Sequence, residues 1–241
     1  MQRKVRAMIK IEKTEVFGWE SAILGMRNPM NSWDKSDSCF SCEDCGECYY
    51  ENGKNIKEHD GVVDTWCDRT KLNIGNKDHK LMMKLAKGGA VHAKYRRMIN
   101  VTCDITAPLY WFKEFDTYKV GTVANSCSTM HKIHSKEFTL DDFSHEHLIE
   151  PIVLAIMNPL ITALNAQRQY YLETKDKKHW WQMIQLLPTS YNQKRTVQLN
   201  YEVLVGMYRD RKNHKLDEWH VFCDWIKSLP HSELIIPEGE E

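Results

Sequence analysis

The stretch YRRMINVTCDITAPLYWFKEFDTYKVGTVANSCSTMH, residues 95–131, changes its character twice. Apolar residues first recur at every second position from Ile99 to Ile105, which is the period of a half-buried β-strand. The aromatic part that follows begins with Thr106, a capping hydroxyl, and with Pro108, which suits the first turn of a helix. The last part, GTVANSCST, is small and rich in hydroxyl groups, so we expect the helix to end around Gly121.

Outside this stretch, the hydrophobic pattern predicts one more strand and several helices. Residues 5–11 alternate between apolar and charged types, as in a half-buried strand. The other apolar segments have helical spacing and are bounded by proline or glycine. We expect helices at residues 19–30, 76–89, 148–187, 196–211 and 217–228, with a break at Asn158–Pro159. The fold class is therefore α+β, with more helix than strand and a helix-rich C-terminal half.

Length and composition indicate one globular domain, residues 1–241. Lys and Arg together number 33, as do Asp and Glu, so no net field attracts a nucleic acid polymer or an acidic membrane. The longest clean apolar run, IVLAIM at 152–157, is too short to cross a bilayer. The basic N-terminus lacks the apolar core of a signal peptide. We therefore expect a cytoplasmic protein.

Residues 31–70 are polar and cysteine-rich, and they are predicted to be an insertion within the domain. The segment CFSCEDCGEC spaces four thiols three positions apart, which is typical of an iron–sulfur cluster and less typical of zinc. Cys67 or a thiol from another subunit is able to complete either site. An unliganded or disulfide-forming loop is the alternative. The predicted metal ligands are Cys39, Cys42, Cys45 and Cys48.

Four histidines lie among acidic residues in HKIHSKEFTLDDFSHEH, residues 131–147. No thiol and no single helical face unites them, so a solvated loop is favoured over a metal site. The sequence contains no glycine-rich dinucleotide fingerprint and no P-loop.

Asn200 and Arg211 are eleven positions apart in the helix predicted at 196–211. Eleven steps of about 100° return to within about 20° of the starting direction, so both lie on one helical face. Leu204 and Met207 fall between them. The face is either an ordinary buried stripe with polar ends or an apolar site flanked by an amide and a guanidinium.

The segment LLPTSYNQKRTVQLNYEVLVGMYRDRKNHKLDEW, residues 186–219, resembles the C-terminal signature of the flavin-dependent thymidylate synthases, the ThyX family. In that family a Leu-Pro turn precedes a helix with Asn and, eleven residues on, Arg. Upstream, GGAVHAKYRRMINVTCDITAPLYWFKEF is similar to the family's Gly-His-x-Ser-x-x-Glu-His helix, its next strand and an Ala-Pro-led helix. His92 matches a family histidine, although Val91 replaces its usual acidic neighbour. More weakly, GMRNP at 25–29 is similar to an early Arg-containing motif.

The loop after the Ala-Pro helix departs from the family. There the family carries Arg-His-Arg-x-x-Ser-x-Asn-Glu/Gln-x-Ser-x-Arg-Tyr, and this sequence keeps near equivalents only at Lys119 and Thr122. A lysine, hydroxyls and exposed backbone N–H groups are nevertheless able to bind phosphate. The loop is therefore predicted to hold a ligand, although its side chains differ from those of the family. A plain surface turn is the alternative.

The resemblance implies a ThyX-like fold, with a central sheet flanked by a helical region, and a homotetramer. It implies reductive one-carbon transfer to the 5-position of a pyrimidine deoxynucleotide such as dUMP. The cofactor would be FAD, with methylenetetrahydrofolate and NADPH as co-substrates. An enzyme of this fold acting on a different nucleotide, and a non-catalytic nucleotide- or metal-binding protein, are the alternatives.

The resemblance and the chemistry of the loop also give site residues, each with an expected role. The expected catalytic residue, which polarises the pyrimidine, is Arg211. The expected flavin-binding residues are His92, Asn200, Tyr118 and Lys119. The expected nucleotide-binding residues are Lys119, Thr122, Asn125, Ser126 and Arg211.

Overall fold

The computed structural model describes residues 9–41, 50–51, 54–55 and 71–236, and it divides the chain into two compact units. Unit 1 comprises Met1–Glu15, Thr102–Leu199 and Met207–Leu229. Unit 2 comprises Val16–Val101, Asn200–Gly206 and Pro230–Glu241. The expectation of a single domain with an insertion at residues 31–70 stays a prediction.

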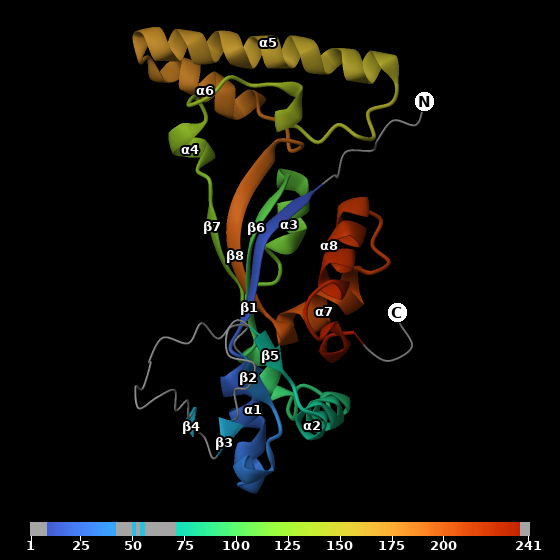
Figure 1. The fold of residues 1–241 in the computed structure, drawn as a ribbon. Helices are drawn as coiled ribbons and strands as arrows, with labels where there is room; N and C mark the ends of the chain where they lie inside the picture. The colour runs from blue at the N-terminus through green and yellow to red at the C-terminus, as the bar shows by residue number, and fades with distance from the viewer. Residues whose placement is uncertain (1–8, 42–49, 52–53, 56–70, 237–241) are drawn as a thin grey trace. The chain divides into compact units, whose positions relative to one another are not determined.

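A four-stranded sheet is the centre of unit 1, and with the surrounding helices it confirms the α+β class (Figure 1). Its strands, in spatial order, are β1 (Lys10–Phe17), β6 (Asn100–Pro108), β8 (Asn192–Asn200) and β7 (Val123–Ser126). The edge strand β7 pairs antiparallel with β8, and Ser126 lies opposite Arg195. The two smaller sheets pair β2 (Cys39–Ser41) with β5 (Lys71–Asn73), and β3 (Tyr50–Glu51) with β4 (Lys54–Asn55).

Strand β6 confirms the alternation read from the sequence, because its apolar side chains from Val101 to Ile105 are buried. Strand β8 differs from the prediction made for its residues. Residues 196–200 were predicted to start a helix, but they continue a strand in which Val197 and Leu199 are buried and Thr196 is exposed. The alternation of buried and exposed residues is that of a strand within a sheet, and pairing in the sheet selects it over a helix. Helix α7 begins only at Tyr201 and ends at Arg211.

The aromatic stretch forms helix α3 (Leu109–Phe115), which packs against α8 (Asp217–Lys227). Trp111 is fully buried, with its ring centroid 4.7 Å from that of Trp219 and 5.7 Å from that of Phe222. The predicted helix start was wrong in detail, because Thr106 belongs to β6 and caps nothing. α3 also ends well before the glycine-led run, since its buried aromatic face is complete after two turns.

Helices α5 (Pro151–Thr174) and α6 (Lys177–Leu186) lie side by side in unit 1 (Figure 1). Leu164 and Met183 are fully buried in the core that they share with Phe143. Pro159 was expected to break the first of these helices, but it lies inside α5. The turn instead occurs at Lys175, whose φ of 57° is left-handed. Packing along α5 outweighs the single backbone hydrogen bond that Pro159 forfeits.

Unit 2 contains α1 (Trp19–Arg27) and α2 (Asn76–Lys87), both close to the predicted bounds. Gly89, just after α2, has a φ of 83°, as expected of a glycine that ends a helix. The short elements of the chain are α4 (Thr129–Lys132), η1 (Asn28–Met30), η2 (Trp33–Lys35), η3 (Lys94–Arg97), η4 (Leu140–Asp142) and η5 (Ser232–Leu234). No helix in the described part of the chain is both long and apolar enough to cross a bilayer.

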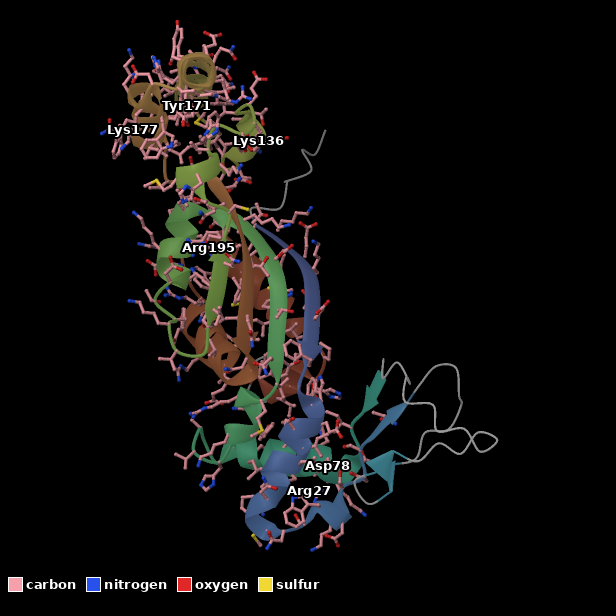
Figure 2. The ribbon with its side chains drawn as sticks, turned by 90° about the vertical axis from the view of Figure 1, so that its left-hand side faces the viewer. Arg27, Asp78, Lys136, Tyr171, Lys177 and Arg195 are labelled. Atoms are coloured by element: carbon pink, nitrogen blue, oxygen red, sulfur yellow. The ribbon has the colours of Figure 1, made fainter. Side chains whose placement is uncertain are left out.

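A buried ion pair joins α1 to α2 within unit 2 (Figure 2). Arg27 Nε lies 2.6 Å from Asp78 Oδ1, and the two side chains are 4% and 0% exposed. The other Arg27 nitrogens donate to the carbonyl oxygens of Ser32 and Lys35, both at 3.0 Å. Asp78 Oδ2 accepts from Ser38 Oγ at 2.7 Å and from the Ser38 backbone N–H at 3.1 Å. The arginine of GMRNP is therefore bonded inside unit 2.

Candidate functional site

A cavity of about 520 Å³ lies in unit 1, at the end of β7 and β8 and beside α4 and η4. Small-molecule sites typically measure about 300–1,000 Å³, so this one has room for a nucleoside monophosphate. The predicted ligand loop lines one side of it with Cys127, Ser128 and Thr129. Tyr191 and Phe138 add aromatic surface. The cavity thus combines hydroxyls with rings on which a base can pack.

Three lysines line the cavity, and their partners differ. Lys194 Nζ lies 2.9 Å from Asp104 Oδ2. Lys136, labelled in Figure 2, forms an ion pair with Asp142. Lys132, at the end of α4, pairs with no carboxylate among the described residues. Because the other two ammonium groups are neutralised locally, Lys132 is the cation best placed to bind an anionic ligand.

The polar wall of the cavity has one unsatisfied group, and its Lys194 is held by a carboxylate, Asp104, that lies outside the lining. Asn192 Oδ1 is buried and has no hydrogen-bond partner among the described residues, so a ligand donor would satisfy it. The hydrogen bond from Thr196 Oγ1, together with that from Lys194, lowers the pKa of Asp104 to about 2. Asp104 therefore stays ionised at neutral pH and keeps Lys194 engaged.

Most of the predicted loop residues are available to a ligand. Lys119, Asn125 and Ser126 are exposed, and their side chains have no partner among the residues the structure describes. Asn125 and Ser126 lie on the edge strand β7. Thr122 differs, because its Oγ1 is buried and has no partner in the described chain. The loop thus offers hydroxyl, amide and ammonium groups, although no contact joins them to one another.

Two of the predicted residues, Arg211 and Tyr118, are brought together in unit 1. Arg211 Nε donates to Tyr118 Oη at 2.9 Å, and Nη1 donates to Glu114 Oε2 at 2.9 Å. The guanidinium carbon also lies 4.9 Å from the centroid of the Trp219 ring, a cation–π distance. Arg211 is 14% exposed and Glu114 44% exposed. The orientation of the Arg211 guanidinium is therefore fixed, while its partner Glu114 remains accessible to solvent.

The electrostatics of this cluster, Arg211 with Tyr118, Glu114 and Trp219, keep its charges fixed at neutral pH. Burial raises the pKa of Tyr118, and the hydrogen bond from Arg211 only partly opposes it. Burial lowers the pKa of nearby His214, and the charge of Arg211 lowers it further. Tyr118 is thus a neutral phenol that accepts from Arg211, and His214 is held toward its neutral form.

The other two predicted flavin residues lie in unit 2. His92 is exposed beside Gly88, and an added Cβ on that glycine would lie 3.1 Å from the imidazole. Asn200 lies at the end of β8, and its Oδ1 accepts from the Val203 backbone N–H at 3.0 Å. It therefore caps the start of α7 rather than lying on the helical face that the eleven-residue spacing predicted.

The cysteine prediction falls outside the described residues. Cys42, Cys45 and Cys48 lie there, and only the backbone of Cys39 is described, in β2. Among residues 131–147, His134 packs its ring on Tyr171 at 4.9 Å, and His145 lies 2.8 Å from the Phe143 carbonyl oxygen. Sequence reasoning missed Lys132 and Lys194, because nothing in the sequence indicates that α4 and β8 meet at a cavity.

No protein-family model matches the sequence, and no curated protein matches it by sequence. The fold, in contrast, is similar to that of flavin-dependent thymidylate synthase ThyX from Helicobacter pylori, solved in complex with FAD and dUMP. The TM-score is 0.61 at 13% identity, over 96% of this chain and 99% of that one. A second structure of that enzyme with FAD and dUMP gives 0.60 and 13%, over 95% and 97%. The predicted ThyX-like fold is therefore confirmed.

Proposed function

We propose that this ThyX-like chain binds a pyrimidine deoxynucleotide and FAD and catalyses reductive one-carbon transfer to the 5-position of the pyrimidine. The observation that carries the proposal is the match in fold, over nearly the whole of both chains, to an enzyme solved with FAD and dUMP. The cavity beside α4 supports it independently, because its size and lining suit a nucleoside monophosphate.

The donor set fits a phosphate-bearing ligand. In the cavity, Lys132 would meet the nucleotide phosphate, and the hydroxyls of Ser128 and Thr129 would donate to its oxygens. Tyr191 would pack on the base, and Asn192 Oδ1 would accept from a base or sugar donor. These contacts bind and orient the nucleotide.

The residues proposed for FAD also fit in their chemistry. Lys119 and Ser126 are exposed in unit 1, and His92 is exposed in unit 2, each with a side chain that lacks a partner in the described chain. Lys119 suits the pyrophosphate of FAD, and Ser126, which the resemblance assigns to the nucleotide, suits the phosphate of that ligand. Bound FAD would supply the hydride chemistry, and the chain would supply orientation and electrostatics.

Arg211 does not line the cavity beside α4. Its proposed role, which is to polarise the pyrimidine, rests on the resemblance to the ThyX family and applies to a nucleotide whose base lies against the Arg211 cluster and not against Tyr191. Its bonds to Tyr118 and Glu114 fix the guanidinium before any ligand arrives. A donor held in place costs little reorganisation when charge develops on a carbonyl oxygen of the base. Methylenetetrahydrofolate and NADPH as co-substrates, a homotetramer and a cytoplasmic location belong to the same proposal.

The first test is the visible absorption spectrum of the anaerobically purified protein, followed by titration with FAD and then with dUMP and dCMP. We expect the bands of oxidised flavin and a spectral change with one nucleotide. A protein that stays colourless and takes up no added FAD would contradict the proposed flavin function. Rescue of a thymidine auxotroph would identify dUMP as the substrate.

The nucleotide cavity has its own test. We expect Lys132→Ala to weaken dUMP or dCMP binding by about tenfold or more, since a charge-assisted hydrogen bond contributes roughly 1.5–3 kcal/mol. Lys84→Ala removes an exposed lysine of α2 and is the matched control. Calorimetric titration measures both. Equal affinity of the two variants would remove the cavity from the proposal.

The second candidate is a nucleotide-binding protein without catalysis. It is favoured by one observation, that two nitrogens of Arg211 already donate to Tyr118 and Glu114. Nucleotide binding in the cavity together with no uptake of FAD would select this candidate.

A further inference from the structure

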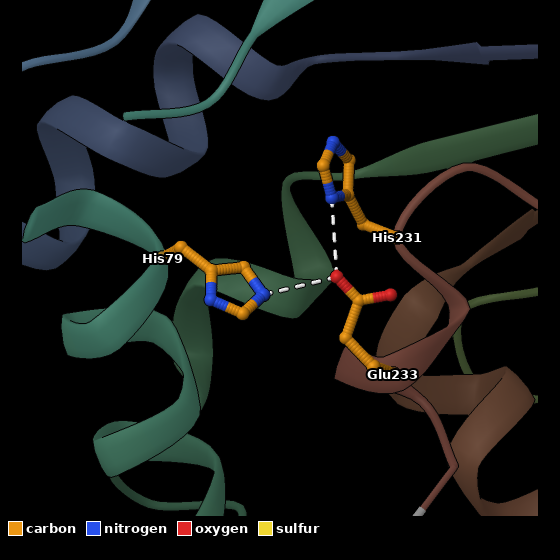
Figure 3. Close-up of side chains that lie close together, drawn as sticks. All are labelled: His79, His231 and Glu233. Atoms are coloured by element: carbon orange, nitrogen blue, oxygen red, sulfur yellow. Dashed lines mark hydrogen bonds and ion pairs between the residues drawn. The ribbon is translucent and has the colours of Figure 1, made fainter. Parts of the chain in front are cut away.

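Two histidines and a glutamate, none of which has a role in the proposed function, meet in unit 2 (Figure 3). His79 lies on α2, His231 directly precedes η5, and Glu233 lies within η5. Glu233 Oε1 is 3.0 Å from His79 Nε2 and 3.2 Å from His231 Nδ1. The three ligand atoms all lie within 4.8 Å of one another.

We propose that His79, His231 and Glu233 form a binding site for one divalent transition-metal ion, with Zn²⁺ the expected occupant. Zinc binds histidine nitrogen at about 2.0–2.1 Å and carboxylate oxygen at about 2.0–2.2 Å, so tetrahedral ligand atoms lie roughly 3.4 Å apart. The two histidine–carboxylate distances, 3.0 and 3.2 Å, are close to that separation. An ion would therefore require only small side-chain shifts.

The donor set selects the class of metal. Two imidazoles and one carboxylate suit zinc and similar borderline ions, whereas calcium and magnesium prefer ligand sets made only of oxygen. Three protein ligands leave a fourth position for water, as in open zinc sites. All three side chains are between 31% and 39% exposed, so an ion reaches them from solvent.

The surrounding structure holds the ligands in place. His231 has a φ of 54°, an uncommon left-handed conformation for a residue other than glycine. Its carbonyl oxygen accepts from the Leu234 N–H at 3.0 Å, and its ring packs edge-on against Trp19 at 5.3 Å. The preceding Pro230 carbonyl accepts a hydrogen bond from the Tyr201 hydroxyl. A strained backbone, maintained by several contacts, is typical of ligand sites.

The ionisation of Glu233 is consistent with a metal-binding role. Burial raises the pKa of Glu233, but hydrogen bonds from its own backbone and from the two histidines outweigh it, so the net pKa is lowered. Glu233 is thus an anion that faces two imidazole nitrogens. A change of tautomer would turn the same two imidazole nitrogens toward an ion as lone-pair donors.

The test is the metal content of the full chain after stripping with chelator and dialysis against Zn²⁺. We expect wild type to hold about one equivalent more than His79→Asn, His231→Asn or Glu233→Gln. Asparagine tolerates the left-handed backbone at position 231, so His231→Asn removes the ligand while keeping the fold. His220→Asn, which alters an exposed histidine of α8, should keep the wild-type content.

The cysteine segment is also able to bind zinc, so a second measurement separates the two sites. The absorption spectrum of the Co²⁺ form of wild type minus that of His231→Asn should lack thiolate charge-transfer bands, because the proposed site holds no sulfur. Equal zinc content in wild type and in folded His231→Asn and Glu233→Gln, or a thiolate signature in the difference spectrum, would overturn the proposal. Neither readout depends on flavin or nucleotide.

Discussion

Two arginine–carboxylate pairs, one in each unit, show what separates a structural arginine from a candidate ligand. Arg27 and Asp78 are 4% and 0% exposed, and neighbouring backbone and hydroxyl groups engage the remaining atoms of both. Arg211 and Glu114 are 14% and 44% exposed, and aromatic rings flank the guanidinium. In both pairs the nitrogen–oxygen distance is that of a hydrogen-bonded ion pair, 2.6 Å and 2.9 Å, so distance alone does not distinguish their roles.

The difference lies in what each pair leaves for a ligand. A buried pair with every group bonded inside the chain is costly to disrupt and offers nothing outward. The Arg211 pair is open on the Glu114 side, so a ligand is able to compete for the guanidinium. Predictions on both pairs follow, in order of their expected effect on the free energy of unfolding.

Asp78→Ala should cause the largest loss of stability. It leaves the Arg27 guanidinium buried without its counter-ion, and breaking such a pair typically costs about 3–5 kcal/mol. Urea unfolding followed by circular dichroism measures the loss. Glu114→Ala, the matched change in the exposed pair, should cost about 1 kcal/mol or less. Equal losses in the two variants would contradict the contrast drawn here.

Acid should act on the buried pair through Asp78. Burial raises the pKa of Asp78, but the hydrogen bonds from Ser36, Ser38 and Arg27 outweigh it and lower the net value. The stabilisation is therefore complete above the unfolded pKa of about 3.9 and is lost as pH falls through the lower, folded value. Asp78→Asn should unfold with a shallower dependence of stability on pH below about 4. An unchanged slope in that variant would argue against this linkage.

Arg211→Ala should abolish the proposed turnover with only a modest loss of stability, about 1–2 kcal/mol, because its ion pair is partly exposed and its ring contacts are weak. Arg211→Lys should also be inactive, since an ammonium cannot reproduce the planar donor geometry. Steady-state assays and urea unfolding measure the two effects. An undiminished rate in Arg211→Ala would discard the catalytic assignment.

Tyr118→Phe should have a small effect on stability, comparable to that of Glu114→Ala. It keeps the ring and removes only the oxygen that accepts from Arg211 Nε, which contributes about 0.5–1.5 kcal/mol to stability. A larger loss of turnover than of stability would indicate that the hydroxyl positions Arg211. Tyr170→Phe, on the half-exposed surface of α5, is the control and should change neither.

The sequence predicted the elements whose pattern is local. The structure confirms the alternation through β6 and the helices α1, α2 and α8. The similarity in fold to the Helicobacter pylori enzyme confirms the predicted ThyX-like fold. Prediction from the sequence failed where tertiary packing decides. Residues 196–200 have a pattern that suits either helix or strand, and their place in the sheet selected the strand. Pro159 stayed inside a helix whose buried residues, Met157 and Leu164, lie on either side of it.

The candidate sites divide in the same way. Arg211 and Tyr118 were each chosen from the sequence, but that they bond to each other depends on how α3 and α7 end. The cavity lysines and the His79–His231–Glu233 cluster left no local signal, since 154 positions separate His79 from Glu233. The local periods could be read from the residues alone, because a period depends only on neighbours along the chain. Which distant side chains share a site could not, because long-range packing sets the distances between them.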